Sequence, residues 1–215
     1  MHLKRQKVPK SWPIFRKGTK YIVRPKSDIR KGIPLLVVLR DMLKVIQNRK
    51  EAKRIIHMKH ILINNKPVID ERKSILLFDT ITLIPLKKHY RLELSEKGKF
   101  EIEEIKENEA DHKIAKITNK KILKGKKTQL NLSDGRNFLS DIKCDVNDSV
   151  LINFKEKKIE KCIHLKEKVK VVIFAGKHSG KKGTLKKIDA EKKIAELNTQ
   201  EDLINVLIKQ LMAVE

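Results

Sequence analysis

Apolar residues first recur with a regular period after Pro34. Leucine, methionine and isoleucine repeat at intervals of three and four residues from 35 to 46, which predicts a helix of about a dozen residues with Arg40 and Lys44 on its outer face. Asn48 and Glu51 have the spacing of a capping box, so a second helix is expected to begin there. The apolar residues that this helix would bury are Ala52, Ile55 and Ile56.

The apolar pattern then becomes typical of strands. Runs at 61–63 and 68–69 flank Asn64-Asn65, a pair that tolerates positive φ, and this predicts a hairpin. One further strand is expected from Ile75 to Ile84. After Pro85, short apolar runs separated by turn residues predict a small barrel or a curled antiparallel sheet; these runs are 90–94, 100–102, 112–117, 128–132 and 149–154.

The last part of the chain contains a glycine-rich loop between predicted strands. A run that begins at Val169 leads into this loop, and strand-like segments follow at 184–188 and 194–197. Between 201 and 212 the apolar positions fit either a helix or a closing strand, and the pattern does not decide between them.

Residues 1–32 contain prolines and no sustained period, which predicts an extended basic arm. Trp12, Phe15 and Tyr21 lie among the cations of this arm. Such rings can stack on exposed bases while the cations bind phosphates. They can equally fix the arm to the protein's own core, and both interpretations stay open.

The charge of the chain favours a polyanionic partner. Lysine and arginine number 51 against 27 acidic residues, which gives a net charge of +24 over 215 residues. The distribution is uneven, because residues 1–32 hold 11 cations and one acid whereas 93–111 hold eight acids and three lysines. With 40% hydrophobic but only 4% aromatic residues, the cores must consist mainly of isoleucine, leucine and valine.

Several classes of function are excluded by the same sequence. No apolar run approaches the roughly 20 residues that cross a bilayer, and the first residues lack the apolar stretch of a secretory signal, so a cytoplasmic protein is expected. Cys144 and Cys162 form no C-x-x-C pair and are interpreted as packing residues, with no metal site. No histidine lies in a nucleophile pattern, so no catalytic residue, cofactor or small-molecule substrate is predicted.

The glycine loop differs from a nucleotide-binding P-loop. A P-loop has four residues between its glycines and a serine or threonine after its lysine. Here three residues separate Gly176 from Gly180, and Lys182 follows Lys181. The alternatives are a loop that approaches RNA or protein and a hairpin turn that uses glycine for backbone reasons alone.

Four segments, in order, resemble the archaeal and eukaryotic small-subunit ribosomal protein family S4e, and the resemblance covers almost the whole chain. The first two are similar to the amino-terminal signature of that family and to the S-four RNA-binding fold, the third to the family's central segment and the fourth to its KOW motif. The segments are His2–Arg5 with Pro9–Lys17, Ile33–Asp41 with Glu51–Ile56, Gln129–Asn137, and Gly176–Gly183. The S-four hairpin usually has glycine where this chain has Lys59 and Asn65, and a left-handed lysine costs on the order of 1 kcal/mol, so a reshaped turn is expected at Lys59.

The resemblance implies an α+β fold of several modules. The expected parts are a basic extended arm at 1–32, an S-four-type helix-helix-hairpin RNA-binding unit at 33–88, a central small β-barrel at 89–165, and a KOW-type SH3-like β-barrel with the tail at 166–215. It also implies a structural, non-enzymatic protein of the small ribosomal subunit in the cytoplasm, with small-subunit rRNA and neighbouring ribosomal proteins as partners. Two alternatives are an RNA-modification or tRNA-linked factor and a KOW-containing transcription elongation factor.

The candidate RNA-binding residues follow from the resemblance together with the charge pattern. Lys50, Lys53 and Arg54 share one face of the second predicted helix. The complete candidate set is Lys4, Arg5, Lys10, Trp12, Arg16, Lys17, Arg40, Lys44, Arg49, Lys50, Lys53, Arg54, His60, Lys66, Arg136, Lys177, His178, Lys181 and Lys182. The glycines expected to shape loops are Gly135, Gly176, Gly180 and Gly183.

Overall fold

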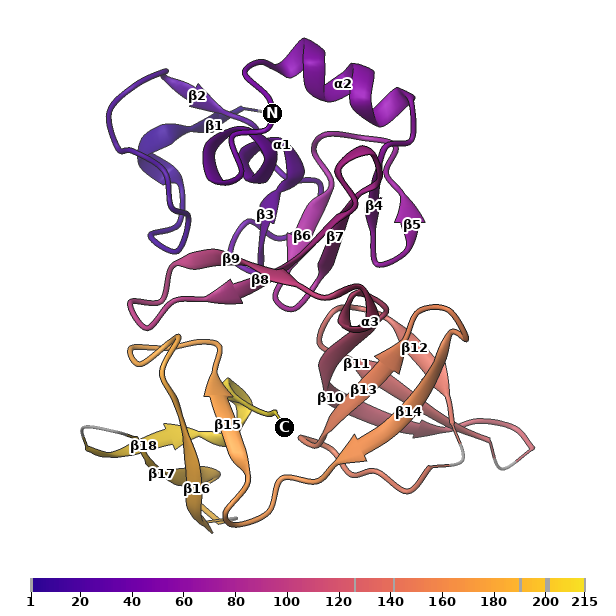
Figure 1. Cartoon of the computed structure of the whole chain (residues 1–215). Coiled ribbons are helices and arrows are strands. Elements are labelled where there is room, and N and C mark those ends of the chain that lie inside the picture. Colours follow the sequence, from indigo (N-terminus) through magenta and orange to yellow (C-terminus); the bar gives the residue numbers. More distant parts are fainter. Residues whose placement is uncertain (1, 126, 141, 190, 200–201, 215) are drawn as a thin grey trace. The chain divides into compact units, whose positions relative to one another are not determined.

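The computed structural model in Figure 1 describes residues 2–125, 127–140, 142–189, 191–199 and 202–214. The fold is mixed, with many strands and few helices. It comprises two compact units, one formed by Met1–Leu94 and Lys99–Asp111 and the other by Ser95–Gly98 and His112–Glu215. None of the helices in the described residues is long and apolar enough to cross a membrane.

The first helix of the first unit is shorter than the periodicity predicts. α1 (Leu35–Val37) continues into a π-helical turn at Val38–Met42, where the Leu43 N–H donates to the carbonyl of Val38. The helix then ends, because Lys44 adopts a left-handed φ of 55°. The predicted apolar stripe is nevertheless buried at most of its positions, with Leu35, Leu36, Leu39 and Ile46 all at 4% exposure or less.

The second helix begins where the capping box predicts. α2 (Arg49–His57) follows Asn48, whose side-chain oxygen accepts hydrogen bonds from the N–H groups of Lys50 and Glu51 at 3.0 and 3.1 Å. The Glu51 carboxylate accepts hydrogen bonds from the side-chain amide of Asn48 and, at 2.8 Å, from the backbone N–H of Gln47. In the usual capping box the backbone donor is the N-cap residue itself, so here the donor lies one residue earlier. Two donors at the helix start are thereby satisfied.

A five-stranded antiparallel sheet follows α2, in the order β5-β4-β7-β8-β9. β4 (Ile61–Ile63) and β5 (Lys66–Pro67) form the predicted hairpin, and both turn residues have positive φ, 51° at Asn64 and 58° at Asn65. The expected reshaping of the turn before this hairpin is wrong, because Lys59 itself takes a left-handed φ of 58°.

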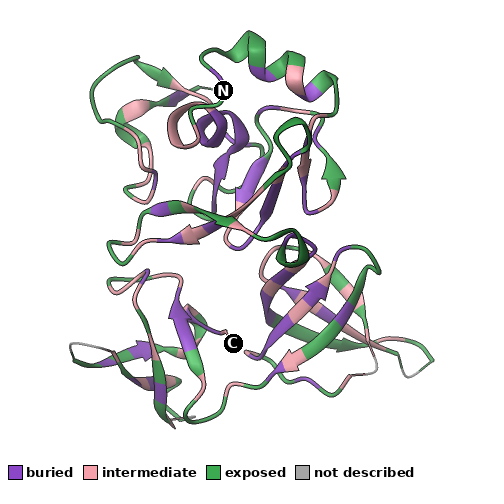
Figure 2. Cartoon of the chain, in the orientation of Figure 1, coloured by how far each residue is buried: buried purple, intermediate pink, exposed green. Residues whose placement is uncertain are grey.

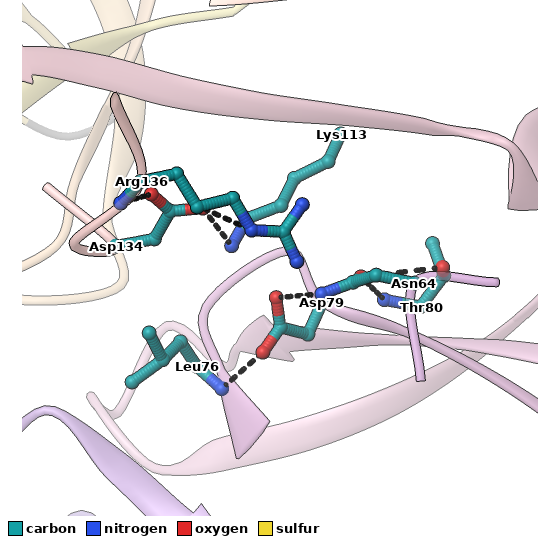
Figure 3. Close-up of polar contacts among 7 residues, drawn as sticks. All are labelled: Asn64, Leu76, Asp79, Thr80, Lys113, Asp134 and Arg136. Atoms are coloured by element: carbon teal, nitrogen blue, oxygen red, sulfur yellow. Dashed lines mark hydrogen bonds and ion pairs between the residues drawn. The ribbon is translucent and has the colours of Figure 1, made fainter. Parts of the chain in front are cut away.

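The single strand expected from 75 to 84 is wrong. Two strands occupy this segment: β6 (Ser74–Leu76) pairs with β3 (Gly32–Pro34), whereas β7 (Thr80–Leu83) pairs with β4 and β8. The turn between them places Phe78 at a φ of 60°. Buried Asp79 closes it by accepting from the Leu76 N–H and from the Asn64 amide, both at 2.7 Å (Figure 3).

Strands 90–94 and 100–102 lie in the sheet of the first unit and not in a central barrel. β8 (Lys88–Leu94) pairs with β7 on one side and with β9 (Phe100–Ile105) on the other. The expected boundary between 88 and 89 therefore falls at the beginning of β8. α3 (Glu107–Ala110) follows β9, and a 3-10 turn at Ile84–Leu86 precedes β8.

The amino-terminal arm belongs to this first unit. β1 (Leu3–Lys4) pairs with β2 (Tyr21–Ile22), and a 3-10 turn covers Arg5–Lys7. Leu3 and Trp12 are buried, with 6% and 2% exposure. The Phe100 N–H donates to the carbonyl of Ser11 at 2.8 Å, so backbone contacts also hold the arm against β9.

The second unit begins with a five-stranded antiparallel sheet in the order β12-β11-β10-β13-β14. β10, β11 and β13 lie on the predicted segments, whereas β12 and β14 were not predicted. A register shift between Ile117 and Asn119 lets the long β10 bend. The bounds of the strands are β10 (His112–Ile122), β11 (Thr128–Leu132), β12 (Asn137–Leu139), β13 (Ser149–Asn153) and β14 (Lys158–Ile163). The core is mainly aliphatic, as the composition predicts.

The remainder of the second unit is another five-stranded antiparallel sheet, in the order β18-β17-β16-β15-β19. The sequence did not decide between helix and strand for the tail, and the structure shows mostly strand. Alternate residues of β18, Ile204 and Val206, pack into the core of this sheet. The bounds are β15 (Lys170–Ile173), β16 (Lys182–Asp189), β17 (Ile194–Asn198), β18 (Leu203–Leu207) and β19 (Leu211–Ala213), with a 3-10 turn at Ile208–Gln210.

A buried lysine joins these two sheets of the second unit. Lys116 on β10 is 3% exposed, and its ammonium donates to the carbonyls of Ile208 and Leu211, the latter at 2.7 Å. Burial lowers the pKa of Lys116 to about 8. Two carbonyl acceptors compensate part of the lost hydration, so the side chain remains inside.

Replacing Asp79 with alanine is expected to destabilise the first unit by about 2 to 4 kcal/mol. The substitution leaves the Leu76 N–H and the Asn64 amide without their carboxylate acceptor in a buried turn. Urea unfolding followed by circular dichroism measures the change. Asp28→Ala, at an exposed position, is the control, and equal stability of the two variants would contradict the assigned role.

Lys116 makes the stability of the second unit depend on pH in a defined direction. Its pKa is about 8 when folded and near 10.5 when unfolded, so the unfolded state binds more protons between these values. The free energy of unfolding should therefore rise from pH 8 to 10, by about 2 kcal/mol. Urea titrations of the wild type and Lys116→Met at each pH isolate this contribution. If the free energies of unfolding of the two proteins changed with pH in the same way, Lys116 would not be its source.

Candidate nucleic-acid interface

The outer surface of α2 carries the densest exposed cations among the candidate residues. Ala52 and Ile56 are buried, and Lys50, Lys53 and Arg54 on the same helix are exposed. Figure 2 shows both buried and exposed positions along this helix. This division arises because apolar residues three and four positions apart occupy one side of the helix. The arrangement presents three flexible positive groups to solvent.

His57 and Lys59 extend this surface, although they were not among the candidates. His57 is exposed in the last turn of α2, four residues after Lys53, and exposed Lys59 follows the helix. The spacing of His57 from Lys53 was visible in the sequence as an i, i+4 pair. We refer to Lys50, Lys53, Arg54, His57 and Lys59 as the α2 surface.

Two arginines expected at this interface also form ion pairs within the fold. Arg49 donates to the buried carboxylate of Glu71, with its Nε 2.8 Å from Oε1. Arg40 donates two hydrogen bonds of 2.9 Å to the Asp41 carboxylate, and this hydrogen bonding raises the pKa of Arg40. Both guanidinium groups already have carboxylate partners, so they add less positive charge to the interface than the sequence suggests.

The remaining candidates near the α2 surface vary in exposure. Lys44 is exposed at the end of the π-helical turn, and Lys66 is exposed on β5. His60 is half-buried between α2 and β4. Lys44 and Lys66 therefore keep the exposure that a phosphate contact requires, and His60 keeps part of it.

The aromatic side chains of the arm differ in how far they are buried. Trp12 is buried and fixes the arm, whereas Phe15 is 88% exposed and Tyr21 is 47% exposed. Arg5 is committed to the arm itself, because its guanidinium donates to the carbonyls of Phe15 and Thr19 at 2.7 and 2.8 Å. Among the candidate residues of the arm, Lys4, Lys10, Arg16 and Lys17 are exposed.

In the second unit, Arg136 takes part in a compact ion cluster (Figure 3). Its guanidinium lies 4.7 Å from the Phe154 ring centre and 3.6 Å from Asp134, which also binds Lys113 at 3.1 Å. Burial opposes ionisation of Asp134, but the Lys113 charge, with hydrogen bonds and Arg136, outweighs it and lowers the Asp134 pKa. Gly135, at a φ of 85°, forms the turn between these residues.

The glycine loop is a sharp connection between β15 and β16. Gly176 and Gly180 have φ of 95° and 93°, values that other residues adopt only with strain. A Cβ at Gly183 would lie 2.7 Å from the Asn198 carbonyl, so pairing with β17 requires glycine there. The loop presents Lys177 and Lys182 as exposed and His178 and Lys181 as half-buried.

The candidate residues therefore do not form one continuous site but lie in separate groups. The α2 surface and the exposed arm cations lie in the first unit, and the cations of the glycine loop lie in the second. Arg5, Arg40, Arg49 and Arg136 are engaged within the fold, and Trp12 is in the core.

Comparison with known proteins identifies the family. The family model described as "Ribosomal family S4e" matches residues 86–159, and the "RS4NT (NUC023) domain" matches residues 1–27. The chain is 38% identical to small ribosomal subunit protein eS4 of Methanocella arvoryzae, over 87% of this chain and 80% of that protein. It is 36% identical to the protein of the same name from Methanothermobacter thermautotrophicus, over 87% and 79%.

A solved structure supports the same assignment. The crystal structure of the 30S ribosomal protein S4e from Thermoplasma acidophilum matches with a TM-score of 0.73 and 26% identity, over 86% of this chain and 95% of that chain. Sequence relatives and a solved fold agree along most of the molecule. The chain belongs to the S4e family of ribosomal proteins.

Proposed function

We propose that the protein is a structural constituent of the small ribosomal subunit that binds and stabilises small-subunit rRNA. Membership of the S4e family, whose relatives are named as small-subunit proteins, is the observation that carries this proposal. The exposed cations of the α2 surface and of the arm support it. The other partners are neighbouring ribosomal proteins, and the location is the cytoplasm.

The binding chemistry is neutralisation of phosphate without reaction. A-form RNA hides its base edges in a deep, narrow groove, so shape and phosphate contacts dominate its recognition. Lysines on flexible stems, such as Lys50 and Lys53, suit this task because they reach phosphates in many geometries. Phe15 and Tyr21 add exposed rings on which unpaired bases can stack.

Two of the modules expected from the sequence have a counterpart in the fold that supports them. α1 and α2 followed by the β4–β5 hairpin support an S-four-type RNA-binding unit within 33–88. The five strands of β15 to β19, with the glycine loop between β15 and β16, support a KOW-type small barrel within 166–215. The α2 surface, Lys44, Lys66 and the cations of this loop would be the rRNA contacts.

The alternatives have less support. An RNA-modifying or tRNA-linked enzyme and a KOW-containing elongation factor would both leave the match of the arm to the S4e family's amino-terminal domain unexplained. Sedimentation of the tagged chain through a sucrose gradient separates the classes, since a ribosomal constituent travels with the small subunit. Sedimentation mainly in free fractions would favour the alternatives.

Reversing charge on the α2 surface is expected to prevent assembly. Lys53→Glu with Arg54→Glu places two carboxylates where phosphates would bind, and the variant should be depleted at least tenfold from purified small subunits, because two repulsive contacts replace two attractive ones. Quantitative mass spectrometry measures its stoichiometry. The control, Lys97→Glu with Lys106→Glu, makes the same charge change in the acidic stretch and should incorporate normally.

Binding to rRNA should weaken steeply with salt. Each neutralised phosphate releases counterions, so a site of about 6 to 10 contacts loses some 10³ to 10⁵ in affinity between 50 and 200 mM salt. Fluorescence anisotropy with a labelled small-subunit rRNA fragment measures this slope. A salt-independent affinity would show that phosphate contacts do not drive binding.

A further inference from the structure

Three potential metal ligands from the second unit meet where β13 begins and β14 ends. The antiparallel register pairs Ser149 with Ile163, which brings Asp148 beside His164. Cys162 and His164 are two residues apart, so their side chains point to the same side of the chain. The chosen ligand atoms of Asp148, Cys162 and His164 all lie within 4.8 Å of one another.

Two of the three distances within this cluster approach those between the ligands of a tetrahedral ion. Cys162 Sγ is 3.8 Å from Asp148 Oδ2 and 4.0 Å from His164 Nδ1, and His164 Nδ1 is 2.7 Å from the same Oδ2. Ligands bonded to zinc at tetrahedral angles lie roughly 3.3 to 3.8 Å apart. The two sulfur distances already approach this spacing, and only the imidazole and carboxylate must separate by about half an ångström to admit the ion.

The groups around the cluster hold its ligands in place. The Asp148 side chain is 9% exposed, and its two oxygens accept from the N–H groups of Leu165 and Asp145, both at 3.0 Å. Such outer hydrogen bonds orient a ligating carboxylate. The His164 side chain is 43% exposed, which leaves room for water to complete the coordination.

The combination of ligand types indicates which class of metal ion the cluster would bind. A thiolate with an imidazole selects a borderline-soft transition metal over magnesium or calcium, which prefer oxygen ligands alone. We propose that Asp148, Cys162 and His164 bind one divalent ion of the zinc class, with water as the fourth ligand. The ion would join the start of β13 to the end of β14 and stabilise the second unit. This inference does not depend on the proposed role in the ribosome.

Cobalt provides the direct test, because its complexes with thiolate and imidazole absorb in the visible and near ultraviolet. The full chain, reduced and freed of metal with a chelator, is titrated with Co²⁺ without oxygen. We expect d–d and thiolate-to-cobalt bands that saturate at one equivalent and disappear when Zn²⁺ is added. Thermal unfolding should shift to higher temperature with Zn²⁺, since an ion that binds only the folded state stabilises it.

Substitutions of single residues test which side chains bind the metal ion. His164→Ala, at an exposed position, should lower the Co²⁺ affinity by at least about tenfold, and His57→Ala, an exposed histidine on α2, should not change it. The chain has two cysteines, so Cys162→Ser should remove the thiolate band and Cys144→Ser should retain it. Circular dichroism confirms that each variant is folded.

Three results would overturn the proposal. One is the absence of the thiolate band from the reduced wild type, and a second is equal affinity of the wild type and His164→Ala. The third is a disulfide between Cys144 and Cys162 in the chain as isolated, combined with no metal uptake after reduction. In that case the cysteines would serve as a redox pair and not as part of a metal site.

Discussion

The surplus of positive charge is the constraint on which the rest of this structure depends. A net charge of +24 cannot be buried, because each unpaired ammonium removed from water costs several kcal/mol. The chain satisfies this constraint with separate sheets whose aliphatic cores are small and whose cations lie outside. Lys113 and Lys116 are buried exceptions, and both have partners, Asp134 for Lys113 and backbone carbonyls for Lys116.

Arginine and lysine take different structural roles in this chain. Arg5, Arg40, Arg49 and Arg136 bind backbone carbonyls or carboxylates, where the planar fork of the guanidinium makes several directed hydrogen bonds. Lysines, whose single charged group has little directional preference, dominate the α2 surface and the glycine loop. These four arginines are therefore bound within the fold, whereas lysine supplies most of the positive charge on the α2 surface and the glycine loop.

Local signals in the sequence predicted local structure well. The Asn48 cap, the Asn64-Asn65 turn and the limits of β11 are all as expected, because each depends on residues close in the chain. Two failures are local, since the first helix ends at Lys44 and Lys59 keeps a left-handed φ. The others concern pairing between distant segments. Periodicity could not show that 75–84 divides between two sheets or that β8 pairs with β7. For the candidate interface, charge located α2, but only the fold shows that Arg49 is bound to Glu71 and that Trp12 is buried.

Ultraviolet crosslinking of purified small subunits, followed by mass spectrometry of the attached peptides, would locate the rRNA contacts of this chain. We expect rRNA crosslinks on peptides containing the α2 surface, on the arm around Phe15, and on the loop from Gly176 to Gly183. The acidic strand β9 and helix α3 should carry few crosslinks, because phosphates are repelled there. Crosslinks concentrated on β9 and α3, with none on α2, would show that exposed cations do not determine where the RNA binds.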